Sequence, residues 1–221
     1  MTDMITPSEF HAADGTADWR VLGDGASAFY RTRSLADAAR LVAAIAALPR
    51  VDEHRPDVDV RADGVTVRLL TKSADGYGMS ERDVELAGGI SAAARDLGLA
   101  ADPSVVRSFL VVPGAADPAV IMPFWEAALG FERRPDSPDE DLVDPRDRLP
   151  GFWFEEMQEP RADGGGAIHV AIWLPYELAE ERVAAAIAAG GRLVRDRAPM
   201  WWTLADSAGN EIDVSTVRGR D

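Results

Sequence analysis

Residues 53–83 of the chain contain three patterned segments, Glu53-His54-Arg55-Pro56, Val65-Thr66-Val67-Arg68-Leu69-Leu70-Thr71-Lys72 and Ser80-Glu81-Arg82-Asp83. In the second segment, Val65, Val67 and Leu69 alternate with polar residues, which predicts a strand with one buried face. In the third, a serine and an aspartate three positions later have the spacing of a capping box, which predicts a helix start at Ser80. The histidine before the strand and the lysine at its end have the placement of a small acid–base site. Spacing alone favours the alternative, a surface histidine beside a proline turn.

The composition limits the class of protein. At 221 residues, the chain has the length of one large domain or two small ones. It has no cysteine, which excludes disulfides and thiolate zinc sites. The net charge of −15 opposes binding to phosphate backbones, so we expect no nucleic acid partner. No basic leader and no long apolar run is present, so we expect a cytoplasmic protein without membrane contact.

Residues 1–99 have the pattern of one α+β domain. The order is helix, two strands, helix, two strands, helix, in the ranges 7–13, 19–22, 26–33, 35–48, up to 60, 65–70 and 80–98. Ser34 is the expected N-cap of the second helix, and Gly23-Asp24-Gly25 the expected turn between the first two strands. A four-stranded antiparallel sheet with helices on one face satisfies this order.

Residues 105–221 have the pattern of a second domain, after a linker at 100–104. Strands are expected at 105–112, 151–157, 167–174, 192–197, 200–205 and 211–217, and helices at 117–130 and 177–189. The proline- and acid-rich residues 135–150 are expected to form a solvated, mobile loop. These elements make two successive βαβββ modules, which form an internal repeat of structure.

The first domain resembles the pterin-4a-carbinolamine dehydratase family. That family's signature is His-His-Pro, an amphipathic strand ending Thr-His, and a Ser-Glu-Arg-Asp helix start. The matching residues here are His54-Arg55-Pro56, Thr71-Lys72 and Ser80-Glu81-Arg82-Asp83, and the likeness extends back through Asp18-Trp19 and Phe29-Tyr30-Arg31. Arg55 and Lys72 replace two of the family's three active-site histidines.

The resemblance implies a hydro-lyase that dehydrates 4a-hydroxytetrahydropterin without a cofactor. His54 would be the general acid or base, because the pKa of histidine lies near neutrality. Lys72 would be a second catalytic group only if burial or nearby cations lower its pKa. The remaining substrate-binding candidates are Arg55, Pro56, Thr71 and Asp83, with Arg55 and Lys72 orienting a more anionic ligand. A changed substrate and a non-catalytic domain remain alternatives.

The second domain resembles the glyoxalase/bleomycin-resistance (vicinal oxygen chelate) superfamily. The residues that carry the likeness are Phe124-Trp125-Glu126-Ala127-Ala128-Leu129-Gly130-Phe131 and Trp201-Trp202-Thr203-Leu204-Ala205-Asp206-Ser207-Ala208-Gly209-Asn210-Glu211. The superfamily often binds a divalent metal, for which His169 and Glu211 are the candidate ligands. Ser108 stands where a further histidine is wanted, and Glu155 or Glu156 would have to supply a carboxylate. The alternative that we favour has His169 lining an apolar cavity with Glu211 nearby, and no metal.

Three functions therefore remain open. The leading one is a dehydratase-type lyase centred on His54. The second is a non-enzymatic binder of a pterin-like or other flat molecule, with tryptophans such as Trp202 walling a pocket and the first domain serving assembly. The third is a metal-dependent lyase or dioxygenase at His169 and Glu211. Both family resemblances also imply self-association into a homo-oligomer.

Overall fold

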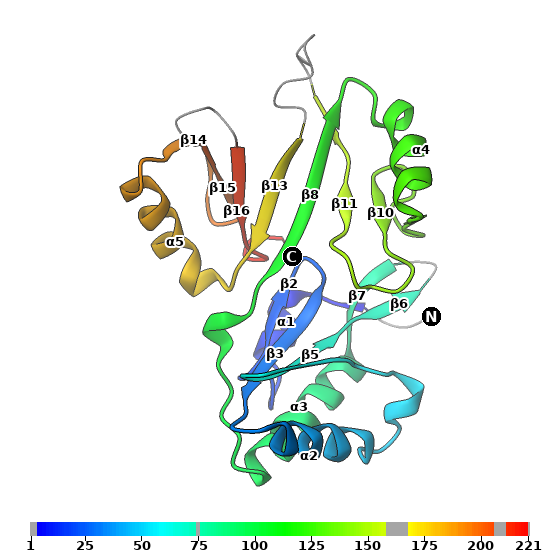
Figure 1. The fold of residues 1–221 in the computed structure, drawn as a ribbon, viewed down its shortest axis with the longest axis vertical. Helices are drawn as coiled ribbons and strands as arrows, with labels where there is room; N and C mark the ends of the chain where they lie inside the picture. Colours follow the sequence, from blue (N-terminus) through cyan, green and yellow to red (C-terminus); the bar gives the residue numbers. More distant parts are fainter. Residues whose placement is uncertain (1–3, 74–75, 158–167, 206–210, 221) are drawn as a thin grey trace. The chain divides into compact units, whose positions relative to one another are not determined.

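The computed structural model describes residues 4–73, 76–157, 168–205 and 211–220. They form two compact units, the first made mainly of residues up to 73, 77–106 and from 217 onward, the second mainly of residues 107–216 (Figure 1). The first unit extends beyond residue 99 because Ala101 and Val217 pack against its core. Residues 100–102, predicted as a linker, continue the edge of a strand: the Arg31 N–H donates to Ala100 O at 3.0 Å and the Asp102 N–H donates to Phe29 O at 2.8 Å.

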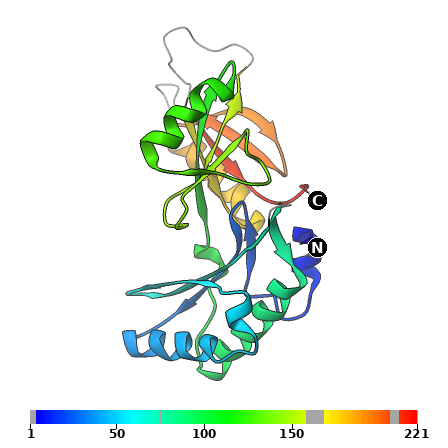
Figure 2. The same ribbon diagram turned by 90° about the vertical axis from the view of Figure 1, so that its right-hand side faces the viewer.

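A four-stranded antiparallel sheet forms the centre of the first unit, as predicted. Its strand order is β2 (Arg20–Leu22), β3 (Gly25–Arg31), β5 (Gly64–Leu69) and β4 (Asp57–Arg61). Helices α2 (Leu35–Ala46) and α3 (Glu81–Asp96) cover one face of it, side by side in both views (Figures 1 and 2), and α1 (Pro7–Ala12) precedes the sheet. The predicted caps are present, since the Ser34 and Thr6 side chains accept the backbone N–H groups of Asp37 and Glu9.

Small residues on β3 let the helices approach the sheet closely. Ala26 and Ala28 pair with Leu69 and Val67 of β5, and all four are buried in one cluster with the apolar faces of α2 and α3. One hydroxyl in this core, that of Ser91 on α3, is hydrogen-bonded by two aromatic side chains. Trp19 Nε1 donates to Ser91 Oγ at 3.1 Å, and the Tyr30 hydroxyl lies 3.1 Å from the same oxygen.

A second, smaller sheet leads into α3. Strands β1 (Met4–Ile5), β7 (Gly76–Ser80) and β6 (Thr71–Ser73) form it in the order β1-β7-β6. The sequence predicts one strand at 65–70 and then the helix from residue 80, so β6 and β7 between them were not predicted. The chain leaves β5 after Leu69 and pairs again in β6, which brings Thr71 close to Ser80, the N-cap of α3. The 3₁₀ turn η1 (Val51–Glu53) precedes His54.

The second unit is a nine-stranded sheet with two helices. Its elements are β8 (Ser108–Ala115), α4 (Pro118–Leu129), β9 (Glu132–Arg133), β10 (Asp141–Val143), β11 (Phe152–Trp153), β12 (Glu155–Glu156), β13 (Ile168–Trp173), α5 (Tyr176–Ala188), β14 (Arg192–Arg197), β15 (Trp201–Ala205) and β16 (Glu211–Ser215). The 3₁₀ turn η2 (Pro103–Val105) belongs to the first unit. The strand order is β14-β15-β16-β13-β8-β11-β10-β9, and β12 also pairs with β8. In each half the first and last strands are parallel, and the halves meet at the antiparallel pair β8 and β13. The paired βαβββ modules and the α+β class are therefore confirmed.

One expectation for this unit is wrong, and part of another lies outside the described residues. The acid- and proline-rich residues 135–150 are not all loop, because β10 lies among them and its Leu142 is fully buried in a core with Met122, Phe152 and Phe154. Residues 206–210 of the closing motif are not among the described residues. In the described part of the chain, no helix has the length and apolar character needed to cross a membrane.

Both cores of the second unit lie on the same face of its sheet. Val111 of the α4 core pairs with Val170, which pairs with Ile212 of the α5 core, so all three point to one side. Because neighbouring residues of a strand point to opposite faces, His169 and Asp213 lie on the other side. His169 and Asp213, with Thr203 paired to Asp213, therefore lie on the face away from the helices.

Candidate functional site

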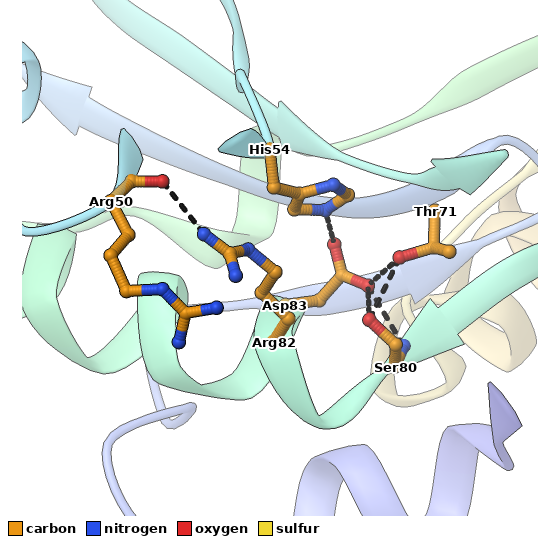
Figure 3. Close-up of polar contacts among 6 residues, drawn as sticks. All are labelled: Arg50, His54, Thr71, Ser80, Arg82 and Asp83. Carbon is orange, nitrogen blue, oxygen red and sulfur yellow. Dashed lines mark hydrogen bonds and ion pairs between the residues drawn. The ribbon is translucent and has the colours of Figure 1, made fainter. Parts of the chain in front are cut away.

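The buried carboxylate of Asp83 is the centre of a hydrogen-bonded group in the first unit (Figure 3). Asp83 is the third residue of α3 and completes the capping box with Ser80. Its Oδ2 accepts from the Thr71 hydroxyl at 2.7 Å and from the hydroxyl and the N–H of Ser80, both at 2.8 Å. Its Oδ1 lies 2.6 Å from His54 Nε2. Asp83 is 0% exposed, so its contacts are with the protein alone.

These contacts determine which nitrogen of His54 faces the carboxylate with a proton. Burial by itself raises the pKa of Asp83, but the hydrogen bonds from His54, Thr71 and Ser80 and the charge of His54 outweigh it, and the net pKa lies below the usual value. An ionised carboxylate only accepts, so His54 Nε2 must carry the proton that joins them. Neutral His54 then has a bare Nδ1, the atom that can accept or return a proton.

His54 leaves this second nitrogen available. The side chain is 16% exposed, and within the described ranges no group hydrogen-bonds to Nδ1. A histidine that is oriented by a buried carboxylate through one nitrogen and open at the other has the arrangement of a general acid–base catalyst.

Two residues predicted to contact the ligand instead hold His54 in position, Asp83 directly and Thr71 through Asp83. The sequence predicts Asp83 and Thr71 as substrate-binding residues, but Asp83 is fully buried and the Thr71 hydroxyl donates to it. Both residues hold the imidazole in place, and a contact of either with a ligand stays a prediction. Ser80, which supplies two of the hydrogen bonds to Asp83, was missed as a site residue. The capping-box spacing of Ser80 and Asp83 was the signal that could have identified it.

The residues that replace the family's other histidines lie at the surface. Arg55 is exposed, and its Nε lies 3.5 Å from Asp52 Oδ1. Lys72 is also exposed, and its Nζ lies 5.6 Å from the ring centroid of Tyr77. Lys72 lacks the burial that favours proton transfer by a lysine, and its catalytic role stays a prediction. Pro56 is partly buried just before β4.

A second histidine–aspartate pair lies in the second unit. His169 Nε2 is 3.4 Å from Asp213 Oδ2, and the Thr203 hydroxyl donates to Asp213 Oδ1 at 2.6 Å. On the other side of the ring, Nδ1 lies 4.0 Å from Glu155 Oε2. Burial lowers the pKa of His169. Asp213, Glu155 and Glu211 together raise this pKa by more than burial lowers it, so the net pKa lies above the usual value.

His169 and Glu211 do not fit the predicted metal site. In the ranges that the structure describes, no three histidine, aspartate or glutamate side chains are grouped so that they could hold an ion. Glu211 instead lies 3.7 Å from Arg195 Nη2, while His169 contacts Asp213. Glu211 is paired with a guanidinium and His169 with an aspartate, so neither side chain is placed as a metal ligand.

Trp202, predicted to wall a ligand pocket, lies in the core of the second unit. It is 6% exposed and packs with Leu204 and Val214 in the core under α5, so the prediction that it binds a ligand is wrong. Its neighbour Trp201 pairs with Ser215, and Trp173 pairs with the same residue from the other side. By register, these two tryptophans lie on the face that carries His169.

Comparisons with known proteins separate the same two parts of the chain. The family model described as pterin 4 alpha carbinolamine dehydratase matches residues 4–93, and the model described as glyoxalase-like domain matches residues 110–215. A search of the curated proteins finds no match.

Three solved structures resemble about half of the chain. An NAD-dependent benzaldehyde dehydrogenase from Legionella pneumophila is 14% identical with a TM-score of 0.37, over 49% of this chain and 97% of its own. A glyoxalase/bleomycin resistance protein/dioxygenase superfamily member from Vibrio splendidus 12B01 is 17% identical with a TM-score of 0.34, over 50% and 99%. A protein from Agrobacterium tumefaciens, solved by NMR, is 24% identical with a TM-score of 0.24, over 50% and 96%.

The two family matches agree with the two units of the fold and with the motif residues around His54. The chain thus joins a segment that matches the pterin 4 alpha carbinolamine dehydratase family model, residues 4–93, to a segment that matches the glyoxalase-like domain model, residues 110–215.

Proposed function

We propose that the first domain is a hydro-lyase of the pterin-4a-carbinolamine dehydratase type and that His54 transfers the protons. The observation that carries this proposal is the 2.6 Å contact between His54 Nε2 and buried Asp83. It fixes one tautomer and leaves Nδ1 as the reactive atom.

The reaction requires one proton to move between neighbouring atoms of the substrate. The bond between C4a and its hydroxyl oxygen breaks, and the electrons of the adjacent N–H bond form the new C=N bond. The nitrogen loses its proton and the departing hydroxyl gains one, so the products are a quinonoid dihydropterin and water. One imidazole can serve both atoms, because Nδ1 accepts the proton from the nitrogen and returns it to the oxygen. Arg55 and Lys72 are exposed cations that would position the ligand but need not exchange protons.

The test is dehydration of 4a-hydroxytetrahydropterin, generated in the assay, by the wild-type chain and by His54→Asn. We expect acceleration by the wild type, with kcat lower by about 10²–10⁴-fold in the variant, which is the usual contribution of general acid–base catalysis. The matched control is His11→Gln, because the ring of His11 accepts the Val21 N–H at 3.2 Å and has no part in the site. A wild-type chain that does not accelerate the reaction excludes the dehydratase function.

For the second domain we propose binding of a small planar ligand. The supporting observation is that the Thr203 hydroxyl donates to Asp213, which lies 3.4 Å from His169 Nε2, on the face that also carries Trp173 and Trp201. Indole rings bind flat ligands, and the polar chain would bind a hydrogen-bonding edge of the ring.

Binding of pterins and other flat heterocycles can be followed by calorimetry in the wild type and in His169→Asn. A ligand whose affinity falls at least tenfold in the variant supports the site, whereas equal affinities for every ligand place binding elsewhere. Self-association of the chain, with the first domain serving assembly, stays a prediction from the family resemblance. Light scattering tests it directly.

A further inference from the structure

We propose that Arg82 is a positioning residue for His54, because it holds the turn that carries this histidine. The inference rests on the proposed dehydratase role of His54 and adds to it a residue that never touches the substrate. It depends on contacts between helix α3 and η1, two elements of the first unit that are far apart in sequence.

The turn that carries His54 is too short to be stable by itself. Two backbone hydrogen bonds close it, from the Glu53 N–H to Arg50 O at 3.0 Å and from the His54 N–H to Val51 O at 3.2 Å. The residue before the turn, Arg50, has φ 59° and ψ 18°, a left-handed conformation that is unusual for a side chain with a Cβ. A single 3₁₀ turn that starts at such a residue needs support from outside.

Arg82 supplies this support at the start of the turn. Its Nη2 donates to Arg50 O at 2.7 Å (Figure 3), and its Nη1 lies 3.2 Å from Glu53 Oε2. The Arg50 side chain also reaches Glu53, with Nε donating to Oε2 at 3.1 Å. The guanidinium of Arg82 thus connects the carbonyl of Arg50, where the turn begins, with the side chain of Glu53, where it ends.

Arg82 and Asp83 are consecutive in α3 and hold the turn at its two ends. Asp83 fixes the ring of His54, while Arg82 fixes the carbonyl of Arg50. The Nε of Arg82 is buried and has no hydrogen-bond partner among the described residues. Such an unpaired donor is unfavourable, so the contacts of Nη1 and Nη2 with the turn, and not Nε, hold the guanidinium in this orientation. The helix therefore determines both where the turn lies and where the imidazole points.

The experiment compares Arg82→Met and Arg82→Lys in the full chain, with Arg50→Gly as the matched control. Methionine keeps the packing of the stem but removes the fork, whereas lysine keeps the charge but cannot make both contacts in the same geometry. Glycine at position 50 keeps the left-handed backbone and the carbonyl that Arg82 binds, and removes only the Arg50 side chain. Circular dichroism and urea unfolding establish which variants are folded.

The first measurement is ¹⁵N NMR of the imidazoles, which needs no activity because the chain has only three histidines. We expect wild type and Arg50→Gly to show His54 protonated at Nε2, with a downfield N–H resonance. In Arg82→Met and Arg82→Lys this resonance should broaden or disappear. Folded variants that keep it unchanged overturn the inference.

The second measurement is dehydration kinetics. A misplaced catalytic group can cost about a hundredfold in rate, so we expect kcat to fall roughly ten- to hundredfold in Arg82→Met, with KM within about twofold of wild type. Wild-type kcat in Arg82→Lys would show that charge alone matters and would overturn the inference. If the wild type itself is inactive while the His54 resonance still depends on Arg82, the dehydratase function fails and the positioning role stands.

Discussion

Replacing Asp83 by asparagine should separate the chemistry of His54 from the fold of the first domain. Asparagine has nearly the same shape, and its amide oxygen can still accept from Thr71 and from Ser80. Its NH₂ group then faces His54 Nε2, which can pair with it only by giving up its own proton. The imidazole would therefore change tautomer and carry its proton on Nδ1.

The expected loss of activity is larger than the loss of stability. A neutral His54 that presents N–H in place of a bare nitrogen cannot accept the substrate proton, so kcat should fall by about 10²–10⁴-fold. Stability changes less, because the hydrogen bonds to position 83 are kept and lose only the charge of the carboxylate, a difference of about 1–2 kcal/mol. Asp83→Ala should cost more, about 2–5 kcal/mol, because it leaves buried donors unpaired and removes the capping box.

The stability difference should depend on pH in a defined direction. Because the pKa of Asp83 is lower in the folded state, its ionised form stabilises the fold above the unfolded aspartate pKa of ~3.9. This contribution is lost as the pH falls through the folded-state pKa. The gap between wild type and Asp83→Asn should therefore be constant from neutral pH to about pH 5 and should narrow below about pH 4.

Stopped-flow dehydration, urea unfolding and imidazole ¹⁵N shifts measure the three effects on the same samples. The control is Asp59→Asn, which removes an acidic residue of the same domain that pairs only at the surface with Arg61. It should change stability by less than about 0.5 kcal/mol. Asp83→Asn with wild-type kcat, or with His54 still protonated at Nε2, would refute the tautomer mechanism.

Three further predictions concern other residues. In the wild type, the free energy of unfolding of the second domain should decline as the pH rises above ~6.5, because the raised pKa of His169 makes its charged form stabilising at lower pH. His169→Asn should remove this decline. Unfolding measured from pH 6 to 9 tests it, and the same pH dependence in wild type and variant would contradict it. Trp202→Ala should cost about 3–5 kcal/mol in urea unfolding, against less than about 0.5 kcal/mol for exposed Leu193→Ala, and equal losses would argue against the assigned core. Lys72→Met should raise the KM for pterin dehydration more than it lowers kcat, whereas a large fall in kcat would support a proton-transfer role for this exposed lysine.

The order of the elements could be predicted from the sequence because it depends on local signals. Thr6, Ser34 and Ser80 cap helices that begin at the next residue, as the spacing of their partners predicts. Short strands gave no such signal. Residues 71–73 and 141–143 are too few to show an alternation, and both are strands because of the strands beside them.

The site was only partly predictable because its contacts join distant segments. The motif identified His54, but the pairing of His54 with Asp83 spans 29 positions and requires the folded turn and helix. Similarly, the sequence offered Trp202 as a ligand contact, and only the register with β16 shows that Trp202 packs in the core while Trp201 lies on the opposite face. A shift of one residue would reverse the face of every side chain on that strand.

The same residue types form a chain in both domains, and their distances favour different functions. In the first, buried Asp83 lies 2.6 Å from His54 Nε2, so the imidazole has one fixed orientation. In the second, Asp213 lies 3.4 Å from His169 Nε2, beyond the usual range of an N–H···O hydrogen bond. A proton-transfer catalyst must be held in one tautomer and one orientation, whereas a binding residue can adjust when its ligand arrives. The geometry therefore favours proton transfer at His54 and ligand binding at His169.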